Sequence, residues 1–597
     1  MNTAKPAANP AVRFDPRRPP SLAEVEKALS AAPGNLELLR RRAGLRIDQG
    51  DLAAAGEDLR RAMAKAGAQA DSTLLLVAAR HALLSGRAAE AERLAARGLG
   101  RAPGNDELYG LLGAALQKQG KTDQAVAAYD AALNLNPFRR TYRIALAQAL
   151  ETKGDRDRAE RVYRQALLTD SGFGDAALNL ANLLQTTERF EEALAMYRRA
   201  ADLLGVKAHV LSNVGALLRK MERYDAARVA YRRAICLAPE DSGPHYNYGN
   251  LCRAEDALDA AIVSYRRAIS CRPNNAELHW NLSLALLCDG RLAEGFDEYE
   301  WRWRYDNFPS KRRDFPQPLW AGESFDGRTL LLHTEQGVGD VLQFLRFLPA
   351  IVERKGATGR IVLECHDNLL SLLEGFPGID AMIPRFATPP PADLHLPLLS
   401  ATRVLGIATL DDLPASVPYL PIPAGPDFPI PEADPDRLKV GFVFGGNPQF
   451  PNDRTRSTQL ETWRPLFELE GVQFFCLQKG EREPEVAGLP ERVVRLNERI
   501  ETFRDTAVAL GQLDLVITTC TSVAHLAGAL GRPFWVVLSR NADWRWLAGR
   551  DDSPWYPSAR LFRQTRLGDW DGVFERVGTA LRAESAAHRA RRSGGGS

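Results

Sequence analysis

The stretch His333–Pro349, "HTEQGVGDVLQFLRFLP", decides the fold of the second half of the chain. An apolar strand over residues 329–332 runs into a loop with two glycines and two acids, and the loop opens into a helix with apolar periodicity. Strand, glycine turn and helix in this order begin an α/β domain, and glycines at the turn let a ligand approach the backbone. The stretch therefore predicts an α/β domain with a binding site at this loop.

Downstream, strand-like and helix-like segments alternate, which predicts two lobes with parallel sheets. The expected strands of the first lobe, residues 329–420, are "RTLLLH", "RIVLEC" and "ADLHLPL". A stretch rich in proline and aspartate, residues 421–437, is the expected linker. The second lobe, residues 438–585, has the strands "KVGFVFGG", "VQFFCLQ", "LDLVITT" and "PFWVVLS". Ligands of such lobes bind at the carboxyl ends of the strands.

Upstream, the chain repeats itself every 34 residues. Small residues recur with this step at two positions of the repeat, and one of these positions is held by Ala125 and then by Ala159. Prolines such as Pro137 close some of the repeats. This pattern resembles the tetratricopeptide repeat, in which stacked helix pairs form a superhelix with a concave face. The tyrosines that keep the same step, and that we expect in the core, are Tyr129, Tyr163, Tyr197, Tyr231, Tyr265 and Tyr299. We expect about eight repeats over residues 21–304.

The remaining segments are interpreted from composition. Residues 1–20 are expected to be a disordered N-terminus, and residues 305–328 a connector rich in proline, charge and aromatic side chains. Residues 586–597 are expected to be a tail, and its final "SGGGS" looks like an engineered linker.

Composition excludes several classes of function. The net charge of +2 gives no sign of a nucleic-acid or membrane partner. No apolar run reaches the roughly 20 residues of a membrane helix, and the N-terminus has no secretory signal. The seven cysteines and nine histidines form no CxxC or HExxH motif. We therefore expect a cytoplasmic protein with no metal site and no bound cofactor.

Asparagines form a second ladder, which packing does not explain. Asparagine is a mediocre helix former, but its amide both donates to and accepts from an extended peptide backbone. Such a ladder resembles that of the O-linked N-acetylglucosamine transferases, where it holds the acceptor polypeptide on the concave face. Amides that are merely solvated or that bridge helices are the alternative. The expected acceptor-binding residues are Asn179, Asn213, Asn247 and Asn281, with Asn182 and Asn250 one turn further along.

Two motifs of the α/β half resemble a known family. The loop "EQGVGD" lacks the GK[ST] ending of a P-loop, and Leu342 replaces the third glycine of a dinucleotide fingerprint. However, "GDVLQFLRFLPAI" and "TCTSVAHLAGALGRP" resemble the two signature segments of the bacterial heptosyltransferases, which are GT-B glycosyltransferases. The resemblance implies two Rossmann-like lobes and a metal-independent transfer from a nucleotide sugar. Cys520 stands where that family has an aspartate.

The resemblance makes Asp340 the expected catalytic base, because its carboxylate can take the proton of an acceptor hydroxyl. Glu335 is the second candidate. The alternative for Asp340 is the cap of a helix over residues 341–349. Gly337 and Gly339 are expected to let the donor approach the loop.

The donor's phosphates are expected at the start of the "TSVAHLAGAL" helix, where amides and the helix dipole favour an anion. The expected donor-binding residues here are Thr521, Ser522, His525, Arg454, Arg456 and Lys479. For Arg454 a solvated loop charge is the alternative. The aromatic cluster Trp544, Trp546, Trp555 and Tyr556 is expected either to pack the lobe or to line the donor site.

Repeats fused to such a domain resemble the bacterial flagellin glycosyltransferases. That likeness implies a protein O-glycosyltransferase that transfers a nonulosonic acid such as pseudaminic acid from a CMP donor to serine or threonine of flagellin. Two alternatives stay open. One is an O-linked N-acetylglucosamine-type transferase with a UDP-sugar, and the other is an inactive repeat scaffold with a degenerate GT-B domain, which Cys520 favours.

Overall fold

The computed structural model describes residues 18–310, 312–424, 428–431, 434, 436–450 and 453–594. Most of the expected disordered N-terminus, parts of the expected linker and the last three residues of the tail lie outside this range. The chain divides into two compact units, residues 1–237 and 238–597, so the division falls inside the repeats. The units are described one at a time.

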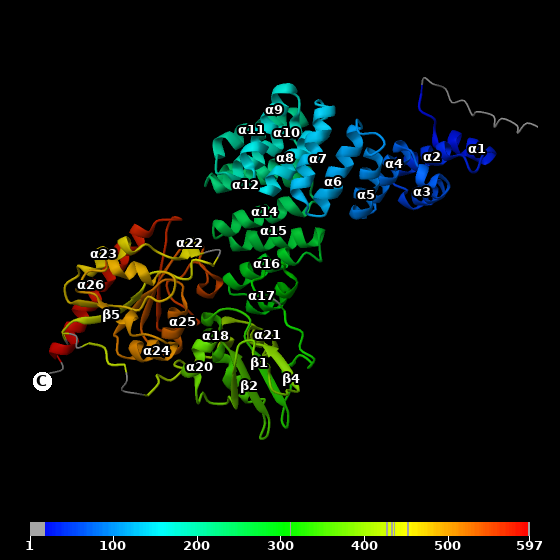
Figure 1. The fold of residues 1–597 in the computed structure, drawn as a ribbon. Helices are drawn as coiled ribbons and strands as arrows, with labels where there is room; N and C mark the ends of the chain where they lie inside the picture. The colour runs from blue at the N-terminus through cyan, green and yellow to red at the C-terminus, as the bar shows by residue number, and fades with distance from the viewer. Residues whose placement is uncertain are drawn as a thin grey trace, which may run out of the picture. The chain divides into compact units, whose positions relative to one another are not determined.

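The first unit is all helical (Figure 1). It begins with α1 (Leu22–Ala31), whose N-terminus is capped by a capping box between Ser21 and Glu24. Antiparallel helix pairs follow, each of which buries one apolar face against its neighbours. The pairs are α2 (Leu36–Asp48) with α3 (Leu52–Ala66), α4 (Ser72–Leu84) with α5 (Ala88–Leu99), α6 (Asp106–Lys118) with α7 (Thr122–Leu135), α8 (Arg140–Lys153) with α9 (Arg156–Thr169), α10 (Gly174–Thr186) with α11 (Phe190–Leu204), and α12 (Ala208–Lys220) with α13 (Tyr224–Leu237).

The tyrosine ladder is a packing device, as the sequence predicts. All six tyrosines are buried. A glycine on the preceding helix makes room for the rings of Tyr129, Tyr231 and Tyr265: a Cβ on Gly113 would lie 2.7 Å from Tyr129 Cε1, and one on Gly249 would lie 2.7 Å from Tyr265 Cε1. The 34-residue step thus sets the spacing of tyrosines and small residues that lets two helices touch.

The turn inside each pair has a residue with positive φ. Glycine holds this position in five repeats, as at Gly120 with φ of 73°. In three successive repeats the residue is Glu188, Glu222 or Asp256, with φ of 60°, 58° and 60°. Because a Cβ makes this backbone conformation unfavourable, these three turns are strained.

The second unit starts with two more repeats and continues into a four-stranded sheet. The repeats are α14 (Ser242–Ala254) with α15 (Leu258–Cys271), and α16 (Ala276–Cys288) with α17 (Leu292–Tyr299). All strands of the sheet are parallel in the order β3-β2-β1-β4. They are β1 (Thr329–His333), β2 (Arg360–Cys365), β3 (Ala381–Pro384) and β4 (Leu394–Pro397), with α18 (Val338–Phe344), α19 (Leu348–Val352), α20 (Asp367–Leu373) and α21 (Ala401–Val404) as their helices.

A second parallel sheet has six strands in the order β10-β9-β8-β5-β6-β7. The four strands that the sequence predicts are present as β5 (Leu438–Val443), β6 (Val472–Cys476), β8 (Leu515–Thr518) and β9 (Phe534–Leu538). The strands β7 (Val494–Arg495) and β10 (Ala559–Arg563) lie at the edges. The helices are α22 (Asp453–Arg456), α23 (Leu460–Phe467), α24 (Phe503–Gly511), α25 (Ser522–Ala529) and α26 (Trp570–Gly594). The fold is therefore the predicted one, with tetratricopeptide repeats followed by parallel α/β sheets.

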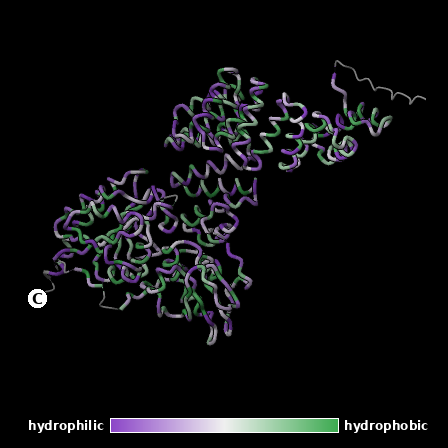
Figure 2. Tube along the Cα trace, viewed as in Figure 1, coloured by the Kyte–Doolittle hydropathy of each residue, from purple (hydrophilic) through white to green (hydrophobic). Residues whose placement is uncertain are grey.

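One hydrophobic core joins the last repeat to both sheets. Phe296 of α17 contacts Phe344 of α18 and Trp544 of the second lobe, with ring centroids 6.3 and 5.8 Å apart. In Figure 2 hydrophobic stretches run through the sheets of this unit and alternate with hydrophilic ones along its helices. Within the described residues, no helix combines the length and the apolarity needed to cross a membrane.

Candidate functional site at the junction of the two α/β lobes

The glycine loop leads from β1 into α18, as the sequence predicts, but the helix starts earlier than residue 341. Gly337 is its N-cap, and Asp340 is the third helical residue. The Asp340 Oδ2 atom accepts a hydrogen bond from the Gly337 amide at 2.8 Å. Asp340 thus caps the helix from inside its first turn and leaves Oδ1 for another partner. The predicted cap is right in kind, and its position is corrected.

Helix α18 of the first lobe packs directly on α25 of the second lobe (Figure 1). A Cβ on Gly339 would lie 2.8 Å from His525 Cδ2 and 3.4 Å from the Ser522 Cα atom. Gly339 is therefore needed for the approach of two helices, whereas its predicted contact with a donor stays a prediction. Gly337 is exposed at the loop.

Asp340 is paired with an arginine that the sequence analysis does not identify. Its Oδ1 accepts a hydrogen bond from Arg545 Nη2 of the second lobe, and Arg545 Nη1 donates to Asp543 Oδ1 at 2.8 Å. The Arg545 side chain is only 8% exposed. Burial alone would lower the pKa of Arg545, but the carboxylates of Asp340 and Asp543 raise it above its ordinary value. The two lobes are thus tied by a buried charge network at the predicted base.

Glu335, at the start of the glycine loop, lies in a second buried network of hydrogen bonds and charges. Its Oε1 accepts a hydrogen bond at 2.8 Å from Arg302 Nη2, which also donates to Ser400. Arg302 belongs to a 3-10 turn over Glu300–Arg304, just after α17. Burial raises the pKa of Glu335 from 4.5 to about 7, although Arg302 opposes the shift. A carboxyl group that titrates near neutral pH therefore lies five residues before Asp340.

The last tyrosine of the repeat ladder also reaches the glycine loop. Tyr299 OH accepts a hydrogen bond at 2.5 Å from Gln336 Nε2. Burial raises the pKa of Tyr299 to about 12, so its hydroxyl stays neutral at physiological pH. Tyr299 and Arg302 show that the end of the repeats supports the loop.

The start of α25 has the features of an anion site. Thr521 is its N-cap and makes no side-chain cap among the described residues, and its hydroxyl bonds Thr518 instead. Ser522 opens the first turn. Arg456 lies close enough to lower the pKa of Cys520, although burial dominates and raises it to about 11. The Cys520 Sγ accepts a hydrogen bond from Trp546 Nε1 at 3.1 Å, so the thiol lines the site as a neutral group.

His525 is less open than predicted. Its Nδ1 shares a hydrogen bond of 2.9 Å with Tyr556 OH, and the ring lies under Gly339. Burial lowers the pKa of His525 to about 3, and Arg545 adds to the shift. The histidine is therefore a neutral packing residue at the junction, and its predicted contact with phosphate stays a prediction.

The remaining predicted donor residues lie apart from this junction or have other partners. Arg456 pairs with Asp453 at 3.1 Å and lies over the Phe450 ring. Arg454 is exposed. Lys479 Nζ donates to Glu483 and to the Asn497 carbonyl oxygen. The aromatic cluster packs the lobe core, since all four of its rings are buried: Trp544, Trp546, Trp555 and Tyr556.

The asparagines of the ladder are partly buried and make hydrogen bonds within the repeats, as the alternative of helix-bridging amides describes, while their predicted contact with an acceptor stays a prediction. Asn182 and Asn250 accept hydrogen bonds from Tyr197 and Tyr265, so they support the core. Asn213 Nδ2 donates to Asn182, and Asn179 donates to the Asp175 carbonyl. Asn281 is 8% exposed and donates to the Glu277 carbonyl. The other members, Asn179, Asn213 and Asn247, are half-buried.

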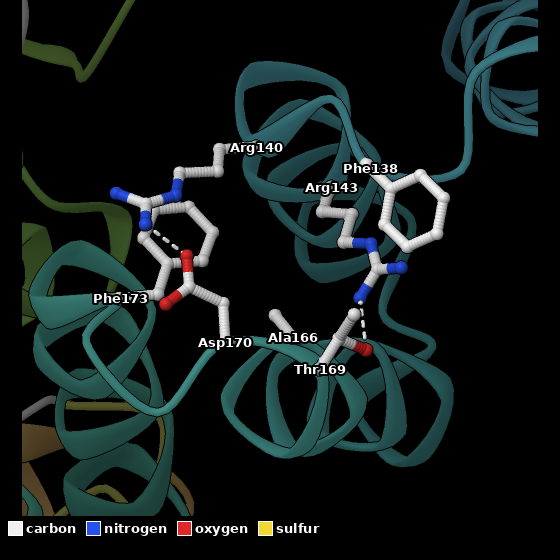
Figure 3. Close-up of a pocket in the computed structure, with 7 residues that line it drawn as sticks. All are labelled: Phe138, Arg140, Arg143, Ala166, Thr169, Asp170 and Phe173. Atoms are coloured by element: carbon white, nitrogen blue, oxygen red, sulfur yellow. Dashed lines mark hydrogen bonds and ion pairs between the residues drawn. The ribbon is translucent and has the colours of Figure 1, made fainter.

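Two surface hollows lie away from the lobe junction. One, of about 220 Å³, opens in the first unit between α8, α9 and the Phe173 segment (Figure 3). Its arginines are already engaged: Arg140 pairs with Asp170, and Arg143 donates to Thr169 at 2.9 Å. The other, of about 450 Å³, lies beside Asp256, Asp259 and Gly549 in the second unit. Neither hollow contains a predicted site residue.

Comparisons with known proteins agree with the helical half. Tetratricopeptide repeat models match residues 82–149, 144–205 and 208–241, and a TPR repeat model matches 249–290. Protein FlbA of Caulobacter vibrioides is 30% identical over 336 residues, which cover 51% of this chain and 54% of FlbA. The chain thus spans about half the length of that relative.

Among solved structures, a tetratricopeptide repeat protein from Parabacteroides merdae is 18% identical and has a TM-score of 0.37. The match covers 42% of this chain and 98% of that one. YrrB, described as a TPR protein with an unusual peptide-binding site, is 22% identical with a TM-score of 0.24, covering 30% and 90% of the two chains.

Proposed function

We propose that the second unit is a glycosyltransferase that moves a sugar from a nucleotide donor to a hydroxyl group of a protein. The observation that carries the proposal is the junction of α18 and α25. It brings the Asp340 carboxylate of the first lobe against Arg545 of the second lobe and against the start of α25. A transferase of this kind needs a base and an anion site side by side.

The donor's phosphate fits the start of α25. First-turn amides and the positive end of the helix dipole attract an anion, and Arg456, which also pairs with Asp453, is near enough to act on Cys520 beside this helix start. Thr519 supports this assignment, because its buried hydroxyl has no hydrogen-bond partner within the described range. These groups stabilise the charge that gathers on the nucleotide as it leaves.

The reaction then needs no metal or redox partner. The oxygen of the acceptor hydroxyl attacks the anomeric carbon, and the bond from that carbon to the phosphate oxygen breaks. The nucleotide leaves with the electron pair, and Asp340 takes the proton of the hydroxyl. Glu335 is the reserve base, since its pKa of about 7 suits proton exchange at neutral pH.

The repeats supply the acceptor, since stacked repeats present an extended surface for a peptide or protein partner. On the basis of the resemblance to flagellin glycosyltransferases, we propose flagellin as the acceptor and a CMP-linked nonulosonic acid as the donor. A scaffold that binds a partner without chemistry is the competing function, and Cys520 is the residue that favours it.

Nucleotide binding separates the two functions. The thermal unfolding temperature of the full chain is measured with and without CMP, UDP or ADP. A nucleotide that binds, present at 100 times its Kd, should add about 2.7 kcal/mol to the free energy of unfolding. We expect CMP to stabilise the protein, Arg456→Ala to reduce the shift, and the control Arg464→Ala, at an exposed arginine of α23, to leave it intact. No shift with any nucleotide would favour the scaffold.

A further inference from the structure

Arg545 is a buried cation of the second lobe that touches the predicted base in the first lobe. We propose that it serves two anions in turn: it binds the Asp340 carboxylate, and a donor phosphate at the start of α25 takes it over and so releases Asp340 to act as a base. This inference rests on the proposed function and names the group that couples donor binding to the base.

The geometry gives Arg545 a fixed anchor and one exchangeable contact. Asp543 accepts from Nη1 at 2.8 Å and from the Arg545 backbone amide at 3.1 Å, so the arginine is held by its own loop. Its Nη2 reaches across the junction to Asp340, which belongs to another lobe. The Nε atom is buried and has no partner in the part of the chain that the structure describes. The guanidinium thus has donor capacity left for a second anion.

Arg545 also lies beside the proposed phosphate site. The next residue, Trp546, donates to Cys520 Sγ at 3.1 Å, two residues before α25. Asp340, the partner of Arg545, follows Gly339, on which a Cβ would lie 3.4 Å from the Ser522 Cα atom at the start of that helix. The Trp544 ring lies 4.4 Å from the guanidinium carbon and limits its movement. A small rotation about the Asp543 anchor therefore changes the partner of Nη2 without moving the loop. A planar guanidinium suits such an exchange, because it binds carboxylate and phosphate with the same fork of N–H groups.

The consequence is competition between Asp340 and phosphate. While Asp340 holds Nη2, the carboxylate occupies this donor, and its negative charge repels a second anion. When phosphate holds Nη2, the carboxylate is free to accept a proton. A donor would therefore switch on its own base, and the base would be masked towards water at other times.

The test is a double-mutant cycle of nucleotide affinity, measured by calorimetry on the full chain with CMP and UDP. Asp340→Asn keeps an oxygen for the Gly337 cap but removes the competing charge, so we expect nucleotide affinity to rise about tenfold. Arg545→Lys keeps the charge but loses the fork, so affinity should fall about tenfold. In the double variant the gain from Asp340→Asn should largely vanish. Arg550→Lys, whose arginine pairs only with Asp552 among described residues, is the matched control and should bind as the wild type does.

The outcomes separate this inference from the proposed function. If the wild type binds no nucleotide, the proposed function fails and this inference with it. If the wild type binds but Asp340→Asn weakens affinity or leaves it unchanged, the exchange is wrong while the transferase proposal stands. An equal gain from Asp340→Asn with and without Arg545→Lys would mean simple repulsion, and would also overturn the exchange. Inorganic phosphate, titrated in parallel, shows whether the phosphate alone competes.

Discussion

At the scale of single residues, two buried ion pairs hold the glycine loop: Arg545 pairs with Asp340, and Arg302 pairs with Glu335. The loop identifies Asp340 and Glu335 because glycines, acids and a helix start lie within a few neighbouring positions. Arg545 lies 205 residues from Asp340, and Arg302 lies in a segment that reads as the end of a repeat. No local pattern marks a residue that becomes functional only through contact between distant elements. The only sequence feature that sets Arg545 apart is that this charged residue lies between two tryptophans of an aromatic cluster.

The buried carboxyl of Glu335 predicts a pH-dependent stability. With a pKa of about 7 in the folded state against 4.5 ordinarily, the folded protein holds a proton between these values that the unfolded chain releases. Its contribution is therefore fully present below about pH 4.5, is lost as pH rises towards 7, and is constant above.

Relative to Glu335→Gln, the wild type should thus lose up to about 3 kcal/mol of unfolding free energy from pH 4.5 to 7. Urea unfolding of both proteins between pH 5 and 8 measures the difference, and the slope over that window is the readout. Parallel curves would show that Glu335 does not titrate there.

The turns with a non-glycine residue at positive φ predict that a glycine substitution there will raise the free energy of unfolding. Glu222 is exposed and has φ of 58°, so Glu222→Gly should relieve the strain and stabilise the α12–α13 pair by about 0.5–1 kcal/mol. Gly120→Ala, at φ of 73° in an equivalent turn, is the matched control and should destabilise its pair. Hydrogen exchange of peptides from each pair measures both effects. Slower exchange in Gly120→Ala would contradict the explanation.

At the scale of elements, the repeats and the central strands were predictable because each has strong periodicity. The tyrosines and small residues mark the helix pairs, and apolar runs mark β1, β5, β8 and β9. The strands β3, β7 and β10 were missed because each is short or has few consecutive apolar residues. For the asparagine ladder, sequence spacing alone does not show that Asn182 and Asn250 accept hydrogen bonds from tyrosine hydroxyls.

The ladder still predicts a mild and cumulative effect on acceptor binding. Asn281 is excluded because it is buried, which leaves Asn179, Asn213 and Asn247 for combined replacement by alanine. Each side-chain hydrogen bond is worth about 1 kcal/mol, so acceptor affinity should fall by at most about 3 kcal/mol, with unchanged nucleotide affinity.

A matched control replaces three exposed glutamines of α7, α8 and α9, namely Gln124, Gln148 and Gln165. Binding of purified flagellin, measured by calorimetry, compares the two triple variants. Equal affinities would leave the asparagines as structural residues and place the acceptor elsewhere.

At the scale of the whole molecule, the repeats and the α/β half are not joined by a linker alone. The last repeat shares its core with both lobes, and Tyr299 and Arg302 hold the glycine loop from the array side. Truncating the chain after the repeats would therefore expose core residues of the α/β unit. No sequence pattern indicates this, because the last tyrosine, Tyr299, keeps the ladder spacing but has a hydrogen-bond partner, Gln336, in the glycine loop.

The central claim is that the junction of the two lobes transfers a sugar to a protein. The most direct measurement is the intact mass of flagellin after co-expression with the wild-type chain and a pathway that makes the CMP-linked nonulosonic acid, next to the same experiment with Asp340→Asn. We predict added mass with the wild type and a roughly 10²–10⁴-fold slower transfer with Asp340→Asn, which keeps the helix cap and loses the base. Unmodified flagellin with the wild type, or equal modification by both proteins, would contradict the account.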